Sequence, residues 1–190
     1  RFGMDNYIET SVLSDNVTGG NYTYPIYYYG TRDYFVPKLT EYFVKASVNA
    51  TIGDPYVMVP LFTTEEVLFN RAEANLYLGN TADVLSDLNL FASKRIVNYD
   101  ATKHDVSIAK AQTYYNTSNS KNALLNTILD FKRAEFIQEG HRWFDIQRYG
   151  ITVTHYDING NKTTVAADDN RRVLQIPLSA QTAGLALNPR

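Results

Sequence analysis

The sequence contains no cysteine, only three histidines and no apolar run of membrane-spanning length. Without cysteine the chain can form neither a disulfide nor a thiolate metal site. Lys and Arg number 18 against 20 Asp and Glu, so the net charge of −2 gives no strong attraction to nucleic acid or to an anionic membrane. His104, His141 and His155 lack the paired spacing of zinc ligands, and we expect no metal and no cofactor.

Tyrosine is unusually abundant, with 15 residues in a chain of 190. The length is sufficient for one domain with a core, or for a large piece of a bigger domain. Tyrosine combines an apolar ring with a hydroxyl at low entropic cost, so it is favoured at recognition surfaces. The alternative is that these are ordinary core and strand tyrosines.

The chain divides into three stretches by composition. Residues 1–62 are broken by Gly and Pro and predict long loops with short strands near 34–36 and 56–59. Residues 63–150 have helical periodicity, and residues 151–190 predict a hairpin and a C-terminal loop. The fold class is therefore mainly α, with irregular loops and short β-hairpins.

Two helices are predicted over 63–78 and 81–96. Thr63 with Glu66 forms a capping box, and Gly79 is a C-terminal stop. Apolar residues cover most of the first helix, which predicts a largely buried helix: Val67, Leu68, Phe69, Ala72, Leu76 and Leu78. We expect Thr81 to cap the second helix, which has one apolar stripe: Leu85, Leu88, Ala92 and Ile96. Together they form a tetratricopeptide-like helical hairpin, which needs partner helices; we expect these upstream, in a longer protein.

Further elements follow. A short helix is expected over 106–112, a long helix capped by Ser120 runs to Glu139, and another covers 142–149. Segments 152–158 and 162–165 flank Asn159-Gly160, the dipeptide of a type I′ hairpin turn. Residues 173–176 predict a last strand.

Charged residues stand inside apolar stripes of these helices. Glu135 extends the stripe of Leu124, Ile128 and Phe131 by one step of four residues. A carboxylate at a core position must be paired, because an isolated buried charge is costly. We therefore predict a structural ion-pair network: Arg71, Glu73, Glu135, Glu139, Arg142, Asp145 and Arg148.

A catalytic interpretation of Glu135 and Glu139 is disfavoured. On one helix, residues four apart face the same way, whereas glycosidases need two carboxylates that flank the bond. Asp168, Asp169 and Asn170 lack the alternation of a calcium loop and predict a solvated turn. We expect no catalytic residue.

The strongest recognition candidate is the tyrosine-rich stretch 22–35. Sugar rings present flat C–H faces that stack on aromatic rings, while their hydroxyls need polar partners. The residues proposed to contact a ligand are Tyr27, Tyr28, Tyr29, Arg32 and Tyr34. The alternative is a strand packed on the core.

Residues 133–150, RAEFIQEGHRWFDIQRYG, resemble the C-terminal signature of the SusD/RagB family. The positions that match are Glu135, Phe136, Glu139, Gly140, Arg142, Asp145, Arg148 and Gly150. The segments LFNRAEANLYLGN (68–80) and LQIP…LNPR (174–190) are similar to further family elements in the same order. Ile146 and Tyr149 depart from the usual Leu and Trp, and Gln181 stands where an acid is common.

The resemblance implies a glycan-binding protein on the outer face of the outer membrane of Bacteroidetes-type bacteria, with no enzymatic activity. It implies a lipid anchor on an N-terminal cysteine that this chain lacks, and partnership with a TonB-dependent, SusC-like transporter. The family signature is scaffold, so it assigns no ligand contact. Two alternatives stay open: a docking module for the transporter without glycan contacts of its own, and a glycoside hydrolase.

Overall fold

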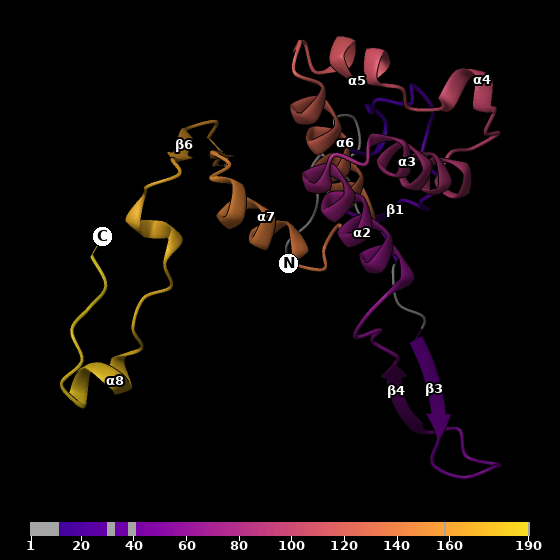
Figure 1. The fold of residues 1–190 in the computed structure, drawn as a ribbon. Coiled ribbons are helices and arrows are strands. Elements are labelled where there is room, and N and C mark those ends of the chain that lie inside the picture. The colour runs from indigo at the N-terminus through magenta and orange to yellow at the C-terminus, as the bar shows by residue number, and fades with distance from the viewer. Residues whose placement is uncertain (1–11, 30–32, 38–40, 158, 190) are drawn as a thin grey trace. The chain divides into compact units, whose positions relative to one another are not determined.

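The computed structural model describes residues 12–29, 33–37, 41–157 and 159–189. The chain forms two compact units, Arg1–Gln138 and Glu139–Arg190. Helices dominate, which confirms the mainly α fold class (Figure 1). The first unit contains helices α2 (Thr64–Leu78), α3 (Thr81–Arg95), α4 (Ala101–His104), α5 (Ile108–Tyr114) and α6 (Ser120–Glu135). Within the described residues, no helix has the length and apolarity needed to cross a bilayer.

Two β-hairpins precede the helices in the first unit. Strand β1 (Tyr27–Tyr29) pairs with β2 (Asp33–Phe35), and β3 (Glu41–Lys45) pairs with β4 (Gly53–Val57), both antiparallel. Strand β2 lies close to the strand predicted near 34–36, and β4 overlaps the one predicted near 56–59.

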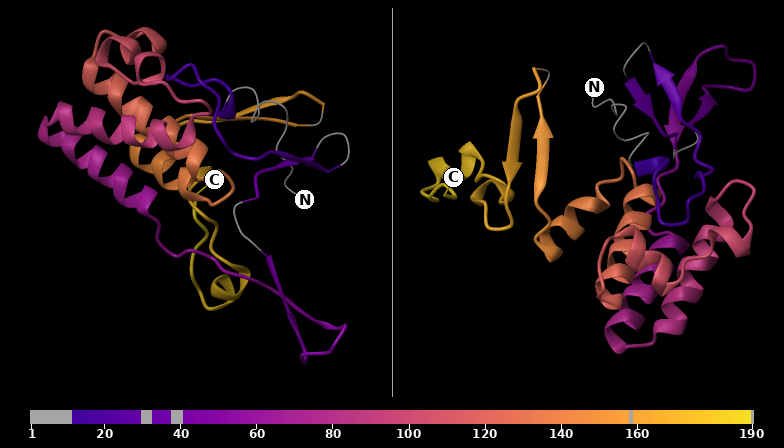
Figure 2. Two further views of the ribbon diagram at one scale, coloured as in Figure 1. Left: turned by 90° about the vertical axis from the view of Figure 1, so that its right-hand side faces the viewer. Right: turned by 90° about the horizontal axis from the view of Figure 1, so that it is seen from above.

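Helices α2 and α3 form the predicted helical hairpin and pack lengthwise against each other, with α6 beside them (Figures 1 and 2). The capping box at Thr63 is present, and Gly79 ends α2 in the left-handed conformation. The expectation that α2 is largely buried was wrong. One face is buried through Phe69, Ala72, Glu73 and Leu76, whereas Val67 and Leu78 are exposed, because α3 and α6 cover only one side.

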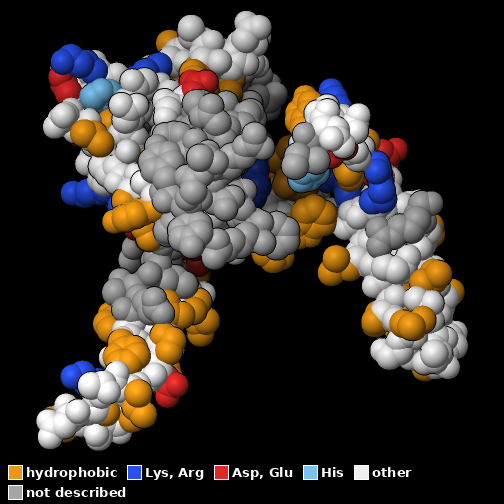
Figure 3. Space-filling view, turned by 180° about the vertical axis from the view of Figure 1, so that it is seen from behind, with side chains coloured by type: hydrophobic (Ala, Val, Ile, Leu, Met, Phe, Trp, Pro, Cys, Tyr) orange, Lys and Arg blue, Asp and Glu red, His pale blue; other side chains and the backbone are white. Residues whose placement is uncertain are grey.

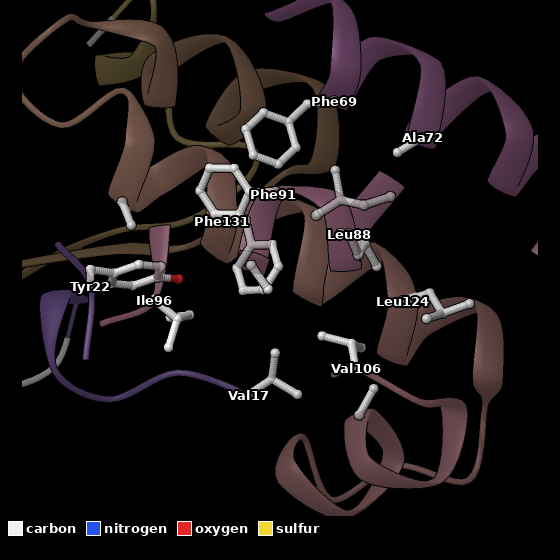
Figure 4. Close-up of a cluster of buried hydrophobic side chains, with 14 of the residues drawn as sticks. Val17, Tyr22, Phe69, Ala72, Leu88, Phe91, Ile96, Val106, Leu124 and Phe131 are labelled. Carbon is white, nitrogen blue, oxygen red and sulfur yellow. The ribbon is translucent and has the colours of Figure 1, made fainter. Parts of the chain in front are cut away.

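The core of the first unit consists of aromatic and aliphatic side chains from α2, α3, α6 and the segment before β1 (Figure 4). Phe91 lies between Phe69 and Phe131, with ring centroids 4.9 Å from each. Tyr22 packs edge-on against Phe131 at 6.4 Å. Burial of these rings is the main source of stability in this unit.

Two capping predictions were wrong by one residue. Asn80 rather than Thr81 precedes α3, and Asn119 rather than Ser120 caps α6, where its side chain accepts from the Asn122 amide at 3.0 Å. A larger error concerns the end of α6. The helix stops at Glu135 instead of Glu139, and Gln138 adopts a left-handed φ of 66°. Glu139 therefore lies beyond the helix, and the i, i+4 argument does not apply to this pair of carboxylates.

The second unit begins with α7 (His141–Tyr149), close to the predicted helix. Strands β5 (Val153–Tyr156) and β6 (Lys162–Val165) form the predicted hairpin, seen as paired arrows in Figure 2. The connection spans five residues, not the two of a type I′ turn, and the Asp157 amide donates to the Asn161 carbonyl at 3.0 Å. Residues 173–176 do not form the predicted strand; they lie between η2 (Asn170–Arg172) and α8 (Leu178–Thr182).

Arg172 organises the second unit. Its buried guanidinium donates to backbone carbonyls of four residues, Ile146, Ile151, Val165 and Ala166. The Ile146 carbonyl lies in the last turn of α7 and also accepts from the Gly150 and Ile151 amides. One side chain thus joins the end of α7 to β6 and the residue after it.

Candidate functional site

The tyrosine-rich stretch separates into a buried part and an exposed part. Tyr22 is buried in the core, and the Tyr24 hydroxyl donates to Glu135. Tyr27, at the start of β1, is 55% exposed. The strand register pairs Tyr28 with Tyr34 and Tyr29 with Asp33, so the stretch folds back on itself. Arg32 lies outside the described residues.

Glu135 is the centre of an ion-pair cluster. The Arg95 guanidinium donates to both carboxylate oxygens, with Nε at 2.8 Å and Nη2 at 3.1 Å, in the bidentate geometry typical of strong Arg–carboxylate pairs. Nη2 of Arg95 also donates to Glu65 at 2.7 Å. The cluster therefore joins α2, α3 and α6, and Tyr24 extends it to the segment before β1.

The charges of this cluster perturb its donors. Burial raises the pKa of the Tyr24 hydroxyl well above its ordinary value, and the negative charge of Glu135 raises it further. The hydrogen bond to Glu135 raises the pKa of Arg95. Both groups therefore stay protonated at neutral pH and remain donors. A carboxylate held by donors on both oxygens is suited to bracing helices rather than to proton transfer.

A second ion pair links α2 to α3. Arg71 donates to Asp87 from Nε at 3.0 Å and from Nη2 at 2.5 Å, and Asp87 is buried while Arg71 is largely exposed. Glu73, also on α2, is buried.

The remaining predicted charges lie in the second unit. Asp145 is buried on α7 and accepts from Arg148 at 3.0 Å, one turn further along the helix. Arg142 lies in the first turn of the same helix, and Glu139 precedes it. Among the described residues, no group of three His, Asp or Glu side chains is placed to hold a metal ion.

Sequence reasoning missed Asp87, Arg95, Glu65 and Tyr24. Asp87 lies three residues after Val84 and four before Phe91, which are both buried, so helical spacing contained the signal. Arg95 follows Phe91 by four residues. The predicted stripe was confirmed at Leu88, Ala92 and Ile96, which are buried, but it did not extend to the Val84, Asp87 and Phe91 side of the same face.

A groove of about 410 Å³ lies between α2 and α3. Its apolar lining includes Val67 and Leu90, and its charged lining consists of Glu65, Arg71, Lys94 and Arg95. Arg71 is paired with Asp87, and Arg95 is paired with Glu65 and Glu135, so the groove is mainly apolar.

Comparison with known proteins gives one family. The model of the SusD family matches residues 6–181, which is nearly the whole chain. No curated protein matches the sequence.

Proposed function

The chain belongs to the SusD family, and from that premise we propose that it binds glycans at the cell surface and passes them to a TonB-dependent outer-membrane transporter. The family match over residues 6–181 carries this proposal, because the family is associated with glycan binding for nutrient uptake and its members are generally non-catalytic. Members are typically lipoproteins of the outer-membrane surface, and we propose the same location for this protein, held by an N-terminal lipid anchor.

We propose the β1–β2 hairpin as a contact surface for the glycan. Exposed Tyr27 offers a ring face on which a sugar ring can stack. Tyr28, Tyr29 and Tyr34 belong to the same small hairpin, and Arg32 lies in the connection between its strands. The planar Arg side chain supplies donors for sugar hydroxyls.

Binding without turnover agrees with the state of the acidic groups. Hydrolysis of a glycosidic bond needs one carboxyl group as acid and another as base or nucleophile, on opposite sides of the bond. Glu135, the carboxylate once considered for this role, is engaged by Arg95 and Tyr24. We therefore assign Glu135 a structural role in the scaffold.

A glycan array followed by calorimetry on the full chain tests this function. We expect saturable binding of an oligosaccharide and no release of shorter products. Tyr27→Ala should weaken binding at least fivefold, since it removes a stacking ring. Tyr77→Ala is a matched control, because Tyr77 is also 55% exposed but lies on α2. A blank array, or equal losses in both variants, would contradict the proposal.

The α2–α3 groove favours a second candidate function, a docking module for the transporter. Its apolar side chains suit a partner segment that is apolar. Val67→Glu with Leu90→Glu should release the transporter from the full chain in a pull-down and leave glycan binding intact. Retention of the transporter together with a blank glycan array would favour docking as the sole function.

A further inference from the structure

The β3–β4 hairpin carries large exposed hydrophobic side chains, and those on the side facing the viewer are orange at the lower left of Figure 3. Its strands pair in one register: Tyr42 opposite Tyr56, Phe43 opposite Pro55, and Val44 opposite Asp54. The tyrosine-rich stretch 22–35 does not include this hairpin.

Two residues fix this register. The Ala46 amide donates to the Ile52 carbonyl at 3.0 Å, which makes that pair hydrogen-bonded. Hydrogen-bonded and non-hydrogen-bonded pairs alternate along antiparallel strands. Pro55, which has no N–H, therefore falls on a non-hydrogen-bonded pair, where no ladder bond is lost. Gly53 admits no side chain, since a Cβ there would approach the Val44 carbonyl oxygen to 2.2 Å. A shift by one residue would violate both constraints.

The fixed register gives the hairpin two chemically different faces. Residues directly opposite one another project to the same face, and alternate residues share it. One face holds Tyr42 and Tyr56, which are 45% and 58% exposed, together with exposed Asp54 and Val44. The other face holds Phe43, Pro55 and Val57, and exposed Lys45 alternates onto it. In this register, Tyr42 and Tyr56 are the directly opposed pair in which both residues are aromatic.

We propose that the Tyr42–Tyr56 pair is a stacking platform for an oligosaccharide, a glycan contact separate from the β1–β2 hairpin. The inference rests on the proposed glycan-binding function and adds a site to it. Opposed residues on antiparallel strands have Cβ atoms about 5 Å apart. Two neighbouring tyrosine rings therefore offer a continuous aromatic surface for consecutive sugar rings.

The polar groups beside the two rings suit a saccharide. Each tyrosine ring ends in a hydroxyl that can donate and accept, and Asp54, two residues before Tyr56 and on the same face, offers a carboxylate acceptor. Sugars combine flat C–H faces with hydroxyls, so they can stack on the rings and bond to these groups at the same time.

The test compares the two faces in the full chain. Calorimetry would use cellohexaose, xylohexaose, mannohexaose and hexagalacturonate, plus the strongest oligosaccharide from the array. We expect Tyr42→Ala with Tyr56→Ala to weaken binding at least tenfold. Phe43→Ala with Val57→Ala, the matched pair on the opposite face, should stay within twofold of the parent. Tyr42→Phe with Tyr56→Phe should retain most of the affinity, because phenylalanine keeps the ring face. All four substituted residues are exposed, so the core is left unchanged.

Three results would overturn the platform. Unchanged affinity in the double tyrosine-to-alanine variant would remove it while leaving glycan binding in place. Equal losses from both faces would show a general apolar effect or protein docking instead of sugar stacking. A chain that binds none of the saccharides would overturn the proposed function as well.

Discussion

The two units of the chain are stabilised in opposite ways. The first buries a continuous set of apolar side chains around Phe69, Phe91 and Phe131. In the described part of the second unit, the two buried residues are Asp145 and Arg172, both charged, while leucines such as Leu174 and Leu178 are exposed. The first unit is organised by apolar burial. The second is organised by Arg172, which donates hydrogen bonds to backbone carbonyls. Among the described residues, the buried apolar core therefore lies entirely before residue 139.

The largest expected effect is in the first unit. Phe131→Ala should lower the free energy of unfolding by about 4 kcal/mol, because it removes a fully buried ring from between the helices. Urea denaturation followed by circular dichroism measures this change. Phe144→Ala on α7 is the control, since Phe144 is exposed, and should change stability by no more than about 0.5 kcal/mol. If both variants lowered the free energy of unfolding equally, the proposed difference in how the two units are stabilised would be wrong.

In the second unit, Arg172→Ala should open the β5–β6 hairpin locally. The change removes the hydrogen bonds that a buried guanidinium donates to the Ile146, Val165 and Ala166 carbonyls, at a cost of about 3 kcal/mol. Hydrogen exchange should show faster exchange of the β5–β6 amides with unchanged protection in α6. Arg171→Ala, at the exposed neighbour, should leave most of that protection in place. Faster exchange in α6 would indicate that Arg172 supports the first unit as well.

A smaller effect is expected at the start of α2. Thr63→Ala should destabilise the helix by about 1 kcal/mol, because the Thr63 hydroxyl accepts from the Glu66 amide at 3.2 Å. Thr63→Ser retains the acceptor and should restore most of the loss, whereas Thr64→Ala should have little effect. Thermal denaturation of the three variants separates these outcomes.

The smallest effect is electrostatic and lies on the surface. Hydrogen bonds from Arg171 lower the pKa of Asp169 to about 2. Because the folded-state pKa is depressed, the contribution of the pair is fully present above the unfolded pKa of about 4 and is lost as pH falls through about 2. A pH titration followed by NMR of the carboxyl groups should show a higher pKa for Asp169 in the Arg171→Ala variant. The pKa of Asp157 is also low, held by Asn161, and should not move.

Much of the helical scaffold could be predicted from local signals. The capping box at Thr63 and the stop at Gly79 gave the bounds of α2, because both depend on residues close in sequence. The exposed side of α2 could not be predicted, since it depends on which helices pack around it. The end of α6 was missed because Gln138 adopts a left-handed φ. This conformation is uncommon for residues other than glycine, so nothing in the sequence gives a reason to expect it there.

The candidate site was less predictable than the scaffold. Glu135 was identified from its place in an apolar stripe, but its partner Arg95 lies 40 residues away and only the packing of α3 on α6 joins them. The Tyr42–Tyr56 pair was missed for a similar reason. The two tyrosines are distant in sequence, and they become neighbours only through the register of β3 and β4.

Pro55 has a consequence beyond its own hairpin. On a non-hydrogen-bonded pair its nitrogen faces away from β3, toward the open edge of β4, where another residue would present a free N–H. An exposed apolar strand with such donors is a template for self-association into larger sheets. The proline withholds that donor at the middle of the edge. The hairpin can therefore keep its aromatic side chains accessible while this edge of β4 disfavours edge-to-edge pairing.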